Sequence, residues 1–431
     1  MFYDKQPEKM KQDYKNMLQI LGSLSKIFSE SDVPYLYYRA HENIFSKYFN
    51  LTNNSRSDDS ADAYSVKEKV GIGLKTWVGQ NNQKVAEFGK LRPQYKDLTG
   101  IELIQRIAEY RNTRIRTTMN THGLDTMLYH IVKRIPKAMQ IYEAAFDYID
   151  IANIVLDEKR GNDNSTYFSD GKHTYHFSLS KNTLYMIFDD MELLDEIDVE
   201  IIDDPFELLS TIMSTAQTSI TDIPTDSETK LPSSKEIIEV VQNSFTPKQQ
   251  LCLRLYSTKA DGTKFVAPKS GLNQWNGERT QYQIDSITGK KIKMGSKKRN
   301  PNELYIPYPS DDRERGAFFP PRDTSFDLLL PDGQWISAKV CQEASKNPEL
   351  QHEGKAIMSN PNKVLGKWLL RDVFELPEDT VITYEMLQVF GIDSVMFTKL
   401  SDLKYSIDFC ALGTYETFYN IEANDDNENI D

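Results

Sequence analysis

The sequence contains few of the residues that build covalent or metal-based frameworks. Only three of its 431 residues are cysteine and six are histidine. Cys252, Cys341 and Cys410 are odd in number and far apart, which argues against a disulfide or zinc framework and is typical of a reducing cytoplasm. The histidines show no metal-ligand spacing. A hydrophobic fraction of 39% is adequate for a globular core without such a framework.

Long hydrophobic runs are also absent. No apolar segment approaches the roughly 20 residues that span a bilayer. The first residues, MFYDKQPEKMKQ, are charged and lack the apolar centre of a signal peptide. We therefore expect a cytoplasmic protein without a membrane partner. Because 431 residues exceed one ordinary core, we also expect two domains.

Positive charge is scarce overall but concentrated in one stretch. The net charge is −13, which by itself argues against a nucleic-acid partner. Residues 248–299, however, hold twelve Lys and Arg against three acids, a local charge of +9, whereas residues 189–207 are almost uniformly acidic. Local charge decides contacts, because salt screens charges beyond about 8–10 Å. Such segregation suits an acidic protein that binds DNA through one region.

Composition and periodicity divide the chain into four parts. We expect an α/β domain over 1–212, a linker rich in Ser, Thr, Asp and Pro over 213–246, a β-rich domain over 247–420 and an acidic disordered tail over 421–431. The fold class is therefore predicted to be α+β. Helices would surround a small mixed sheet in the first domain, and the second would be barrel-like.

Helical spacing of apolar residues predominates in the first domain. It predicts an amphipathic helix over 8–29, another after Pro34 and a third that begins with the capping box Thr99–Glu102. Residues 124–148 also fit a helix, whereas 173–188 alternate as a hairpin. The third helix carries arginines whose face is either solvated or in contact with phosphates: Arg106, Arg111, Arg114 and Arg116.

A group of acids precedes a short apolar strand that delivers a lysine. Asp58, Asp59 and Asp62 are followed by Val70–Leu74, in which apolar residues alternate with glycine, and then by Lys75. This alternation suits a buried strand that another backbone or a ligand approaches closely. Metal-assisted phosphodiester hydrolysis requires a carboxylate that holds a divalent cation and an ammonium group that stabilises charge on phosphorus. A surface loop before a core strand is the alternative explanation.

Flanking residues could extend this group. Glu42 lies on the predicted helix that precedes the acids, where it is either a further metal ligand or a solvated glutamate. Gln83 and Glu87 stand one turn apart on a predicted helix over 83–88, which begins shortly after Lys75.

The second domain is dominated by short alternating segments. They indicate strands at Leu251–Tyr256, Glu303–Tyr308, Phe326–Leu330, Trp335–Val340, Trp368–Val373 and Ser406–Phe409. Thr383–Phe390 is the one convincing helix that we predict here, with Gly391 as its C-cap. Seven or so short strands favour a closed or partly open barrel.

Spaced motifs of this second domain resemble a known family. They occur in the order Ser270–Asn276, Arg299–Pro307, Phe318–Pro320, Leu330–Gly333, Lys355–Asn362, Leu365–Arg371 and Gly391–Val395. Over roughly residues 250–418 they resemble the C-terminal DNA-binding domain of NgoFVII-type restriction endonucleases, a pseudobarrel similar to the plant B-three domain. The resemblance implies two arms that grip the major groove of DNA.

The same resemblance assigns DNA contacts to two groups of residues. The first arm would hold Asn273, Gln274, Trp275 and Asn276, with Arg299 nearby. The second arm would hold Ser359, Asn360, Asn362 and Lys363. Asn and Gln can pair with adenine and Arg with guanine, while Ser and Lys can contact phosphate. The alternative is that these segments only form turns.

The first domain departs from that family. NgoFVII-type enzymes carry a phospholipase-D-like nuclease with a His-x-Lys motif, and His176 and Lys181 have the wrong spacing for it. Residues 34–90 instead resemble the PD-(D/E)XK nucleases. That resemblance implies site roles for four residues, two of them metal ligands: Asp62 and Glu42 as ligands, Lys75 as the catalytic lysine and Gln83 on the following helix.

One departure from the PD-(D/E)XK pattern concerns the acid two residues before the lysine. That position is Gly73 here, so Glu42 or Glu87 would have to replace the carboxylate. The prediction is a type II restriction endonuclease that cleaves double-stranded DNA with Mg²⁺, since carboxylate and phosphate oxygens suit that ion.

Partners and alternatives follow from this prediction. Cutting both strands usually requires two active sites, so we expect a homodimer at least on DNA, together with a cognate DNA methyltransferase. One alternative is a non-catalytic sequence-specific DNA-binding protein. Another is a metal-independent nuclease that uses His173 or His176, although both suit ordinary sheet histidines, on opposite faces of their strand.

Overall fold

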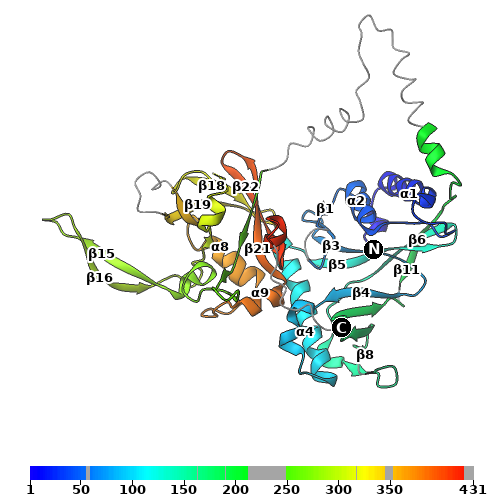
Figure 1. Cartoon of the computed structure of the whole chain (residues 1–431), viewed down its shortest axis with the longest axis horizontal. Coiled ribbons are helices and arrows are strands. Elements are labelled where there is room, and N and C mark those ends of the chain that lie inside the picture. The colour runs from blue at the N-terminus through cyan, green and yellow to red at the C-terminus, as the bar shows by residue number, and fades with distance from the viewer. Residues whose placement is uncertain are drawn as a thin grey trace, which may run out of the picture.

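The computed structural model contains two sheets in the first half of the chain and a barrel in the second (Figure 1). The structure describes residues 1–54, 59–162, 164–189, 191–211, 249–316, 318–344 and 353–421. Asp58, the predicted linker over 213–246 and the predicted tail beyond residue 421 lie outside these ranges. Within them, no helix has the length and apolar composition to cross a membrane.

A six-stranded mixed sheet with the order β1-β2-β3-β5-β6-β11 forms the centre of the first half. Neighbouring strands are antiparallel except β3 and β5, which pair in parallel. Parallel neighbours need a crossover connection, and the long helix α4 (Gly100–His122) lies within it. The strands are β1 (Thr52–Asn53), β2 (Ala63–Ser65), β3 (Val70–Val78), β5 (Thr126–Ile135), β6 (Ala138–Ala145) and β11 (Glu192–Asp198).

Helices cover both faces of this sheet. α1 (Glu8–Ser23) and α2 (Tyr38–Tyr48) lie on one face, where Phe45 packs in the same core as Ile72 of β3. α4 lies on the other face, in the core that contains Trp77. Because side chains alternate along a strand, β3 contributes to both cores.

A second, antiparallel sheet packs against the far side of α4. Its order is β4-β10-β9-β8-β7, and its inner side chains join the core that surrounds α4. Its strands are β4 (Asn82–Glu87), β7 (Val155–Leu156), β8 (Ser165–Ser169), β9 (Thr174–Ser178) and β10 (Thr183–Ile187). Short helical turns connect these elements: η1 (Tyr3–Lys5), η2 (Ser25–Ile27), η3 (Gly89–Leu91), α3 (Arg92–Tyr95) and η4 (Ile151–Asn153).

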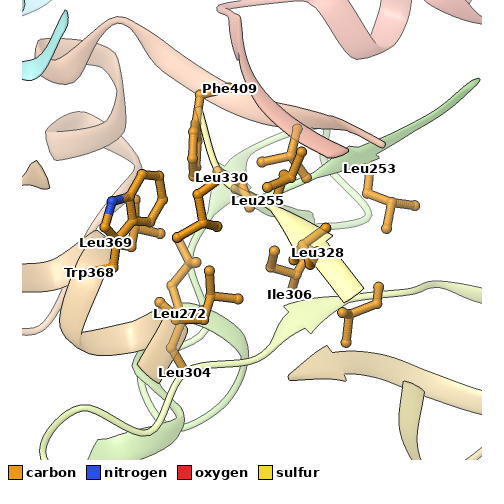
Figure 2. Close-up of a cluster of buried hydrophobic side chains, with 14 of the residues drawn as sticks. Leu253, Leu255, Leu272, Leu304, Ile306, Leu328, Leu330, Trp368, Leu369 and Phe409 are labelled. Carbon is orange, nitrogen blue, oxygen red and sulfur yellow. The ribbon is translucent and has the colours of Figure 1, made fainter. Parts of the chain in front are cut away.

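The second half of the chain forms a nearly closed barrel of seven strands, so the α+β fold class with a β-rich pseudobarrel is confirmed. The order is β12-β21-β22-β18-β19-β20-β17. Leu253, Leu328 and Trp368 belong to its core (Figure 2). The strands are β12 (Gln250–Arg254), β17 (Ile306–Pro307), β18 (Ser325–Leu329), β19 (Trp335–Glu343), β20 (Gly354–Ser359), β21 (Ile392–Ser401) and β22 (Lys404–Ala411).

Two hairpins and several helices decorate the barrel. The hairpin of β15 (Glu278–Ile284) and β16 (Lys291–Lys298) extends far from the body (Figure 1). The smaller hairpin pairs β13 (Ser257–Thr258) with β14 (Lys264–Phe265). The helices are η5 (Gly271–Asn276), α7 (Ser310–Arg313), α8 (Val364–Lys367), η7 (Trp368–Val373), α9 (Tyr384–Phe390) and α10 (Thr414–Phe418).

Three secondary-structure predictions are wrong. Residues 124–148, predicted as a helix, form the hairpin β5–β6. Residues 83–88, also predicted as a helix, form most of β4, and 368–373, predicted as a strand, are helical. β5 lies inside the sheet with apolar residues on both faces, so its sequence lacks the period of two that identifies a strand.

Other predictions are confirmed. The hairpin over 173–188 is β9–β10, and a long helix begins at residue 100, although Thr99 makes no side-chain cap. The helix α9 ends at Gly391, whose φ of 83° is the left-handed conformation that favours glycine.

The barrel contacts the first half of the chain through α4. Glu375, just after η7, accepts a hydrogen bond from Asn120 at 3.0 Å and pairs with Arg116 at 3.3 Å. Gln388 of α9 donates to the carbonyl of Lys90 at 3.3 Å. The helix that links β3 with β5 is therefore also a contact surface for the barrel.

Candidate active site and nucleic-acid interface

Asp62 and Lys75 come together at one edge of β3. Asp62 directly precedes β2, and its N–H donates to the carbonyl of Ile72 at 2.9 Å. Its carboxylate Oδ2 accepts a hydrogen bond from the backbone N–H of Leu74 at 2.6 Å. Lys75 is the next residue of β3, half-buried, on the face that also carries Trp77. The carboxylate therefore lies where β2 leaves the edge of β3, next to the strand that carries the lysine.

The electrostatics of this edge are dominated by burial. Burial raises the pKa of the Asp62 carboxyl group, while Lys75, the N–H of Leu74 and Arg39 lower it. The raised pKa means that the ionised form of Asp62 is incompletely compensated by its surroundings. A further positive charge at this edge would stabilise the carboxylate.

Glu42 belongs to the same neighbourhood. It lies on α2 with only 6% of its surface exposed, and its Oε2 accepts a hydrogen bond from Arg39 Nη1 at 3.1 Å. Arg39 also acts on Asp62, so one guanidinium group is shared electrostatically by the two predicted metal ligands. The solvated glutamate considered as the alternative does not describe this buried side chain.

The position of the missing acid is filled by aromatic rings. A Cβ atom added to Gly73 would lie 2.8 Å from Tyr129 Cδ1 and 2.9 Å from Phe146 Cε1. The two rings stack with centroids 4.1 Å apart, and Tyr129 pairs with Gly73 across β3 and β5. Arg111 donates to the Tyr129 hydroxyl at 3.1 Å and keeps that side of the ring in place. Gly73 is therefore required by packing, and no acid fits there unless the rings move.

Gln83 and Glu87 do not extend the site as predicted. Both lie on β4 of the second sheet and not on a helix. The Gln83 side chain donates to the carbonyl of Gln80 at 2.8 Å, and Glu87 pairs with Lys84. The register that pairs β4 with β10 places both residues in a different sheet from Asp62. We therefore leave them out of the candidate site.

A magnesium ion at this site would have to take most of its ligands from substrate and water. No three His, Cys, Asp or Glu side chains within the described ranges converge as a metal site. Mg²⁺ is commonly held by one or two carboxylates together with phosphate oxygens and waters. Asp62 and Glu42 are the two carboxylates that would hold such an ion, and the incompletely compensated charge of Asp62 is of the right sign.

Asp59, another of the predicted acids, has a structural partner. Its Oδ2 lies 2.8 Å from His122 Nε2, and Asn54 donates to it at 2.6 Å. His122 is buried and its ring stacks on Tyr64 with centroids 4.1 Å apart. Asp59 thus fixes the loop before β2 to the end of α4.

The two sheet histidines show no sign of a nucleophile. His176 stacks between Tyr167 and Tyr185, with ring centroids 4.7 Å from each. Burial lowers the pKa of His176, and Lys181 lowers it further. His173 lies 3.5 Å from Asp147. Both faces of the His176 ring are therefore covered.

The arginines of α4 mostly serve contacts within the protein. Arg111 is 2% exposed, and its guanidinium group lies over the Phe146 ring at 5.0 Å. Arg114 donates to the carbonyl of Glu87 at 2.8 Å, and Arg106 pairs with Glu109 at 3.2 Å. These contacts explain the arginines without phosphate.

The predicted first DNA arm is largely buried. Asn273, Gln274 and Trp275 are 0%, 7% and 2% exposed. Asn273 makes two hydrogen bonds of 2.8 Å with the backbone of Ile382, and Trp275 belongs to the barrel core. Asn276 is half-buried and donates to the carbonyl of Pro268 at 2.9 Å. In this conformation the first three side chains do not reach a base edge.

Residues of the second arm divide into structural and accessible ones. Ser359 is fully buried and its hydroxyl accepts the N–H of Leu365 at 2.9 Å. Asn360 and Lys363 are exposed, and Asn362 is half-buried.

A large polar concavity lies beside the second arm. It has a volume of about 1040 Å³ and lies along the β15–β16 hairpin, beside the segment that carries Asn362. Arg279, Lys297, Lys298 and Arg299 line it. Arg299 pairs with Glu303 and Lys298 with Asp379, so their charges are partly neutralised, and Arg279 and Lys297 complete a positive wall. This basic surface was missed at the level of single motifs, although the charge of residues 248–299 pointed to it.

The basic surface lies in a part of the chain that is similar to a known DNA-binding domain. The family model of the NgoFVII C-terminal B3-like DNA-binding domain matches residues 253–401. These residues are therefore similar to a B3-like DNA-binding domain. The match includes the β15–β16 hairpin and the second arm, and it leaves residues 1–252 unassigned. No curated protein matches the chain.

Proposed function

We propose that the chain is a type II restriction endonuclease that cleaves double-stranded DNA in the presence of Mg²⁺. The observation that supports this proposal is the electrostatic contact of Asp62 with Lys75 and with Arg39, which also binds Glu42, in a chain whose second half is similar to a B3-like DNA-binding domain. Binding and cutting would then be separate tasks of the two halves of the chain.

Each residue of the candidate site has a chemical task in this proposal. Asp62 and Glu42 would hold Mg²⁺, which when bound polarises a phosphate oxygen and lowers the pKa of a water molecule. Lys75 would orient the attacking water or stabilise the charge that grows on phosphorus. Arg39 holds Glu42 in place and lowers the pKa of Asp62, which favours the ionised, metal-binding form.

DNA would be held by exposed basic and amide groups of the B3-like domain. Lys363 and Asn360 are accessible, and Asn362 between them lines the concavity that the basic wall of the β15–β16 hairpin also lines. Lysines would contact phosphates, while amides such as that of Asn360 would read base edges. We do not carry Gln274 and Trp275 into this interface, because they are buried.

The remaining partners stay part of the proposal. Cutting both strands calls for two active sites, so we expect a homodimer at least on DNA. A cognate methyltransferase would protect the host sequence, and both proteins would act in the cytoplasm.

A second candidate function is sequence-specific DNA binding without cleavage. The observation that favours it is Gly73, whose neighbouring rings leave no room for the usual acid. The metal-independent histidine nuclease has less support, because tyrosine rings cover both faces of His176.

Cleavage of a sequenced phage genome by the purified full chain tests the proposal. With Mg²⁺ we expect a defined fragment pattern, which Lys75→Ala abolishes and Lys84→Ala, at an exposed lysine of β4, leaves intact. Duplex binding should survive Lys75→Ala because Lys75 lies in the first half of the chain, outside the B3-like domain. If the wild-type chain binds DNA but cuts nothing with Mg²⁺ or Mn²⁺, the binding-only function is correct. Cutting that persists in excess EDTA identifies a metal-independent enzyme.

A further inference from the structure

The β15–β16 hairpin is the most exposed element of the B3-like domain (Figure 1). Every residue of its two strands is exposed except the half-buried Thr280. The strands pair from Glu278 with Lys298 to Ile284 with Lys291, a length of about 23 Å at roughly 3.3 Å per residue. An element of this length reaches well beyond the barrel.

The hairpin carries an unusual number of large apolar side chains for a surface element. Their exposed fractions range from 47% to 93%: Tyr282, Ile284, Ile287, Ile292 and Met294. Ile287, at the turn, is the most exposed large hydrophobic residue that the structure describes. Exposed apolar groups gathered on one element mark a surface that a partner covers.

The charge of the hairpin identifies the chemistry of that partner. Residues 278–298 contain six Lys or Arg and two acids, within a chain whose net charge is −13. A basic and apolar ribbon fits a polyanion with apolar surfaces between its charges. Duplex DNA has this composition, since phosphates flank grooves whose walls are sugar carbons. A matching hairpin of a second copy would instead bring like charges together.

Hydrogen bonds order the backbone of the tip around Ile287. Asp285 Oδ1 accepts hydrogen bonds from the N–H groups of Ile287 at 2.8 Å and Thr288 at 3.1 Å. Two backbone hydrogen bonds of 2.9 Å, from Gly289 to the Asp285 carbonyl and from Asp285 to the Lys290 carbonyl, close the turn. A backbone ordered in this way loses little additional freedom when the residue at the tip inserts into a partner.

We infer that this hairpin enters the minor groove of duplex DNA and that Ile287 inserts between adjacent base pairs, which bends the duplex. The inference rests on the proposed DNA binding and adds a deformation of the DNA to it. The minor groove is about 6 Å wide, narrower than a two-stranded ribbon, so entry opens it. Apolar wedges that enter this groove unstack a base step and kink DNA by about 20–90°. The hairpin lysines would lie along the phosphates at both edges of the opened groove.

Energy transfer between dyes at the two ends of a cleavage-mapped duplex tests the bend. The full chain without divalent metal should bring the dyes closer, and 2-aminopurine beside the kinked step should brighten as it unstacks. Ile287→Ala should abolish the brightening and most of the approach, with a smaller loss of affinity. Ile20→Ala, at an exposed isoleucine of α1, is the matched control and should behave like the wild type.

Several outcomes overturn the inference and leave the proposed function untouched. They are binding of the duplex without approach of the dyes, or an unchanged bend and 2-aminopurine signal in Ile287→Ala. A chain whose mass in sedimentation falls from dimer to monomer when Ile287 is replaced, without DNA, uses the hairpin to hold a second copy instead. Failure of the wild type to bind any duplex overturns the proposed function as well.

Discussion

Lysine has opposite surroundings in the two regions that carry the proposed activity. Lys75 lies half-buried on a central strand beside a carboxylate whose pKa burial raises. Lys291 and Lys293 of the β15–β16 hairpin are exposed, on an element that has few acids. A buried charge interacts strongly with its nearest neighbours, because the surrounding dielectric is low. Exposed charges interact weakly one by one, but together they attract a polyanion. The surroundings of Lys75 are thus suited to chemistry and the hairpin to the capture of DNA.

Replacement of Asp62 is the largest expected effect and tests the buried side of this contrast. Asp62→Asn should lower the cleavage rate by on the order of 10³, as expected for a lost electrostatic contact in a catalytic site. The free energy of unfolding at pH 7 should not fall, because the burial that raises the pKa of Asp62 opposes its charge. Gel assays and urea unfolding measure the two quantities, with Asp97→Asn at an exposed acid as control.

A strong loss of stability in Asp62→Asn would break the contrast. It would mean that the carboxylate is a structural anchor for Leu74 and not a poised ligand.

A second buried carboxylate, that of Asp393 in the barrel, makes the stability of the fold depend on pH. Burial raises the pKa of Asp393 to about 6, although the Gly413 N–H and Lys264 lower it. The protonated form therefore stabilises the fold fully below about pH 4, the pKa range of an unfolded Asp, and this contribution is lost as pH rises through 6. Relative to Asp393→Asn, the unfolding free energy of the wild type should fall by on the order of 3 kcal/mol between pH 4 and 7.

Urea unfolding of both proteins at several pH values measures this difference. A constant gap between wild type and Asp393→Asn across the range would contradict it.

The salt dependence of DNA binding tests the role of the exposed lysines of the β15–β16 hairpin. Replacing Lys291, Lys293 and Lys297 with alanine should reduce the slope of log affinity against log salt by about 1 for each lysine that contacts a phosphate. Fluorescence anisotropy between 50 and 200 mM salt, roughly the range in which such effects are large, measures it. Lys84→Ala should keep the wild-type slope, and equal slopes for all variants would remove the hairpin from the interface.

The smallest expected effect concerns Gly73. Gly73→Ala places a Cβ atom against the stacked rings of Tyr129 and Phe146, so we expect a loss of about 1 kcal/mol in unfolding free energy from overpacking. Gly89→Ala is the control, because its Cβ would lie 3.9 Å from the nearest atom. Unchanged stability in Gly73→Ala would show that the rings move easily, and an acid at this position would then be feasible.

The sequence predicted the local features of the site better than its long-range ones. Asp62 and Lys75 were expected to meet, because a turn and one strand separate them, and their electrostatic contact agrees with this. The ring of Tyr129 was not anticipated, since it reaches Gly73 only through parallel pairing across the α4 crossover. Periodicity within a segment contains no information about such pairing.

Motif residues of the barrel illustrate the same limit. Asn273 and Trp275 stand out in the sequence, but the structure uses them to join η5 to the segment around Ile382 and to fill the core. Their chemistry fits a base edge as well as a backbone carbonyl, and burial alone distinguishes the two. The fold class, by contrast, follows from the density of short strands and turns.

The stacked rings beside Gly73 have an evolutionary consequence. A relative that carries the usual acid at the position of Gly73 needs a smaller side chain where this chain has Tyr129, because both cannot occupy the space above β3. The two positions are therefore expected to change together among homologues. Arg111, whose hydrogen bond has no acceptor once the hydroxyl is lost, should change with them.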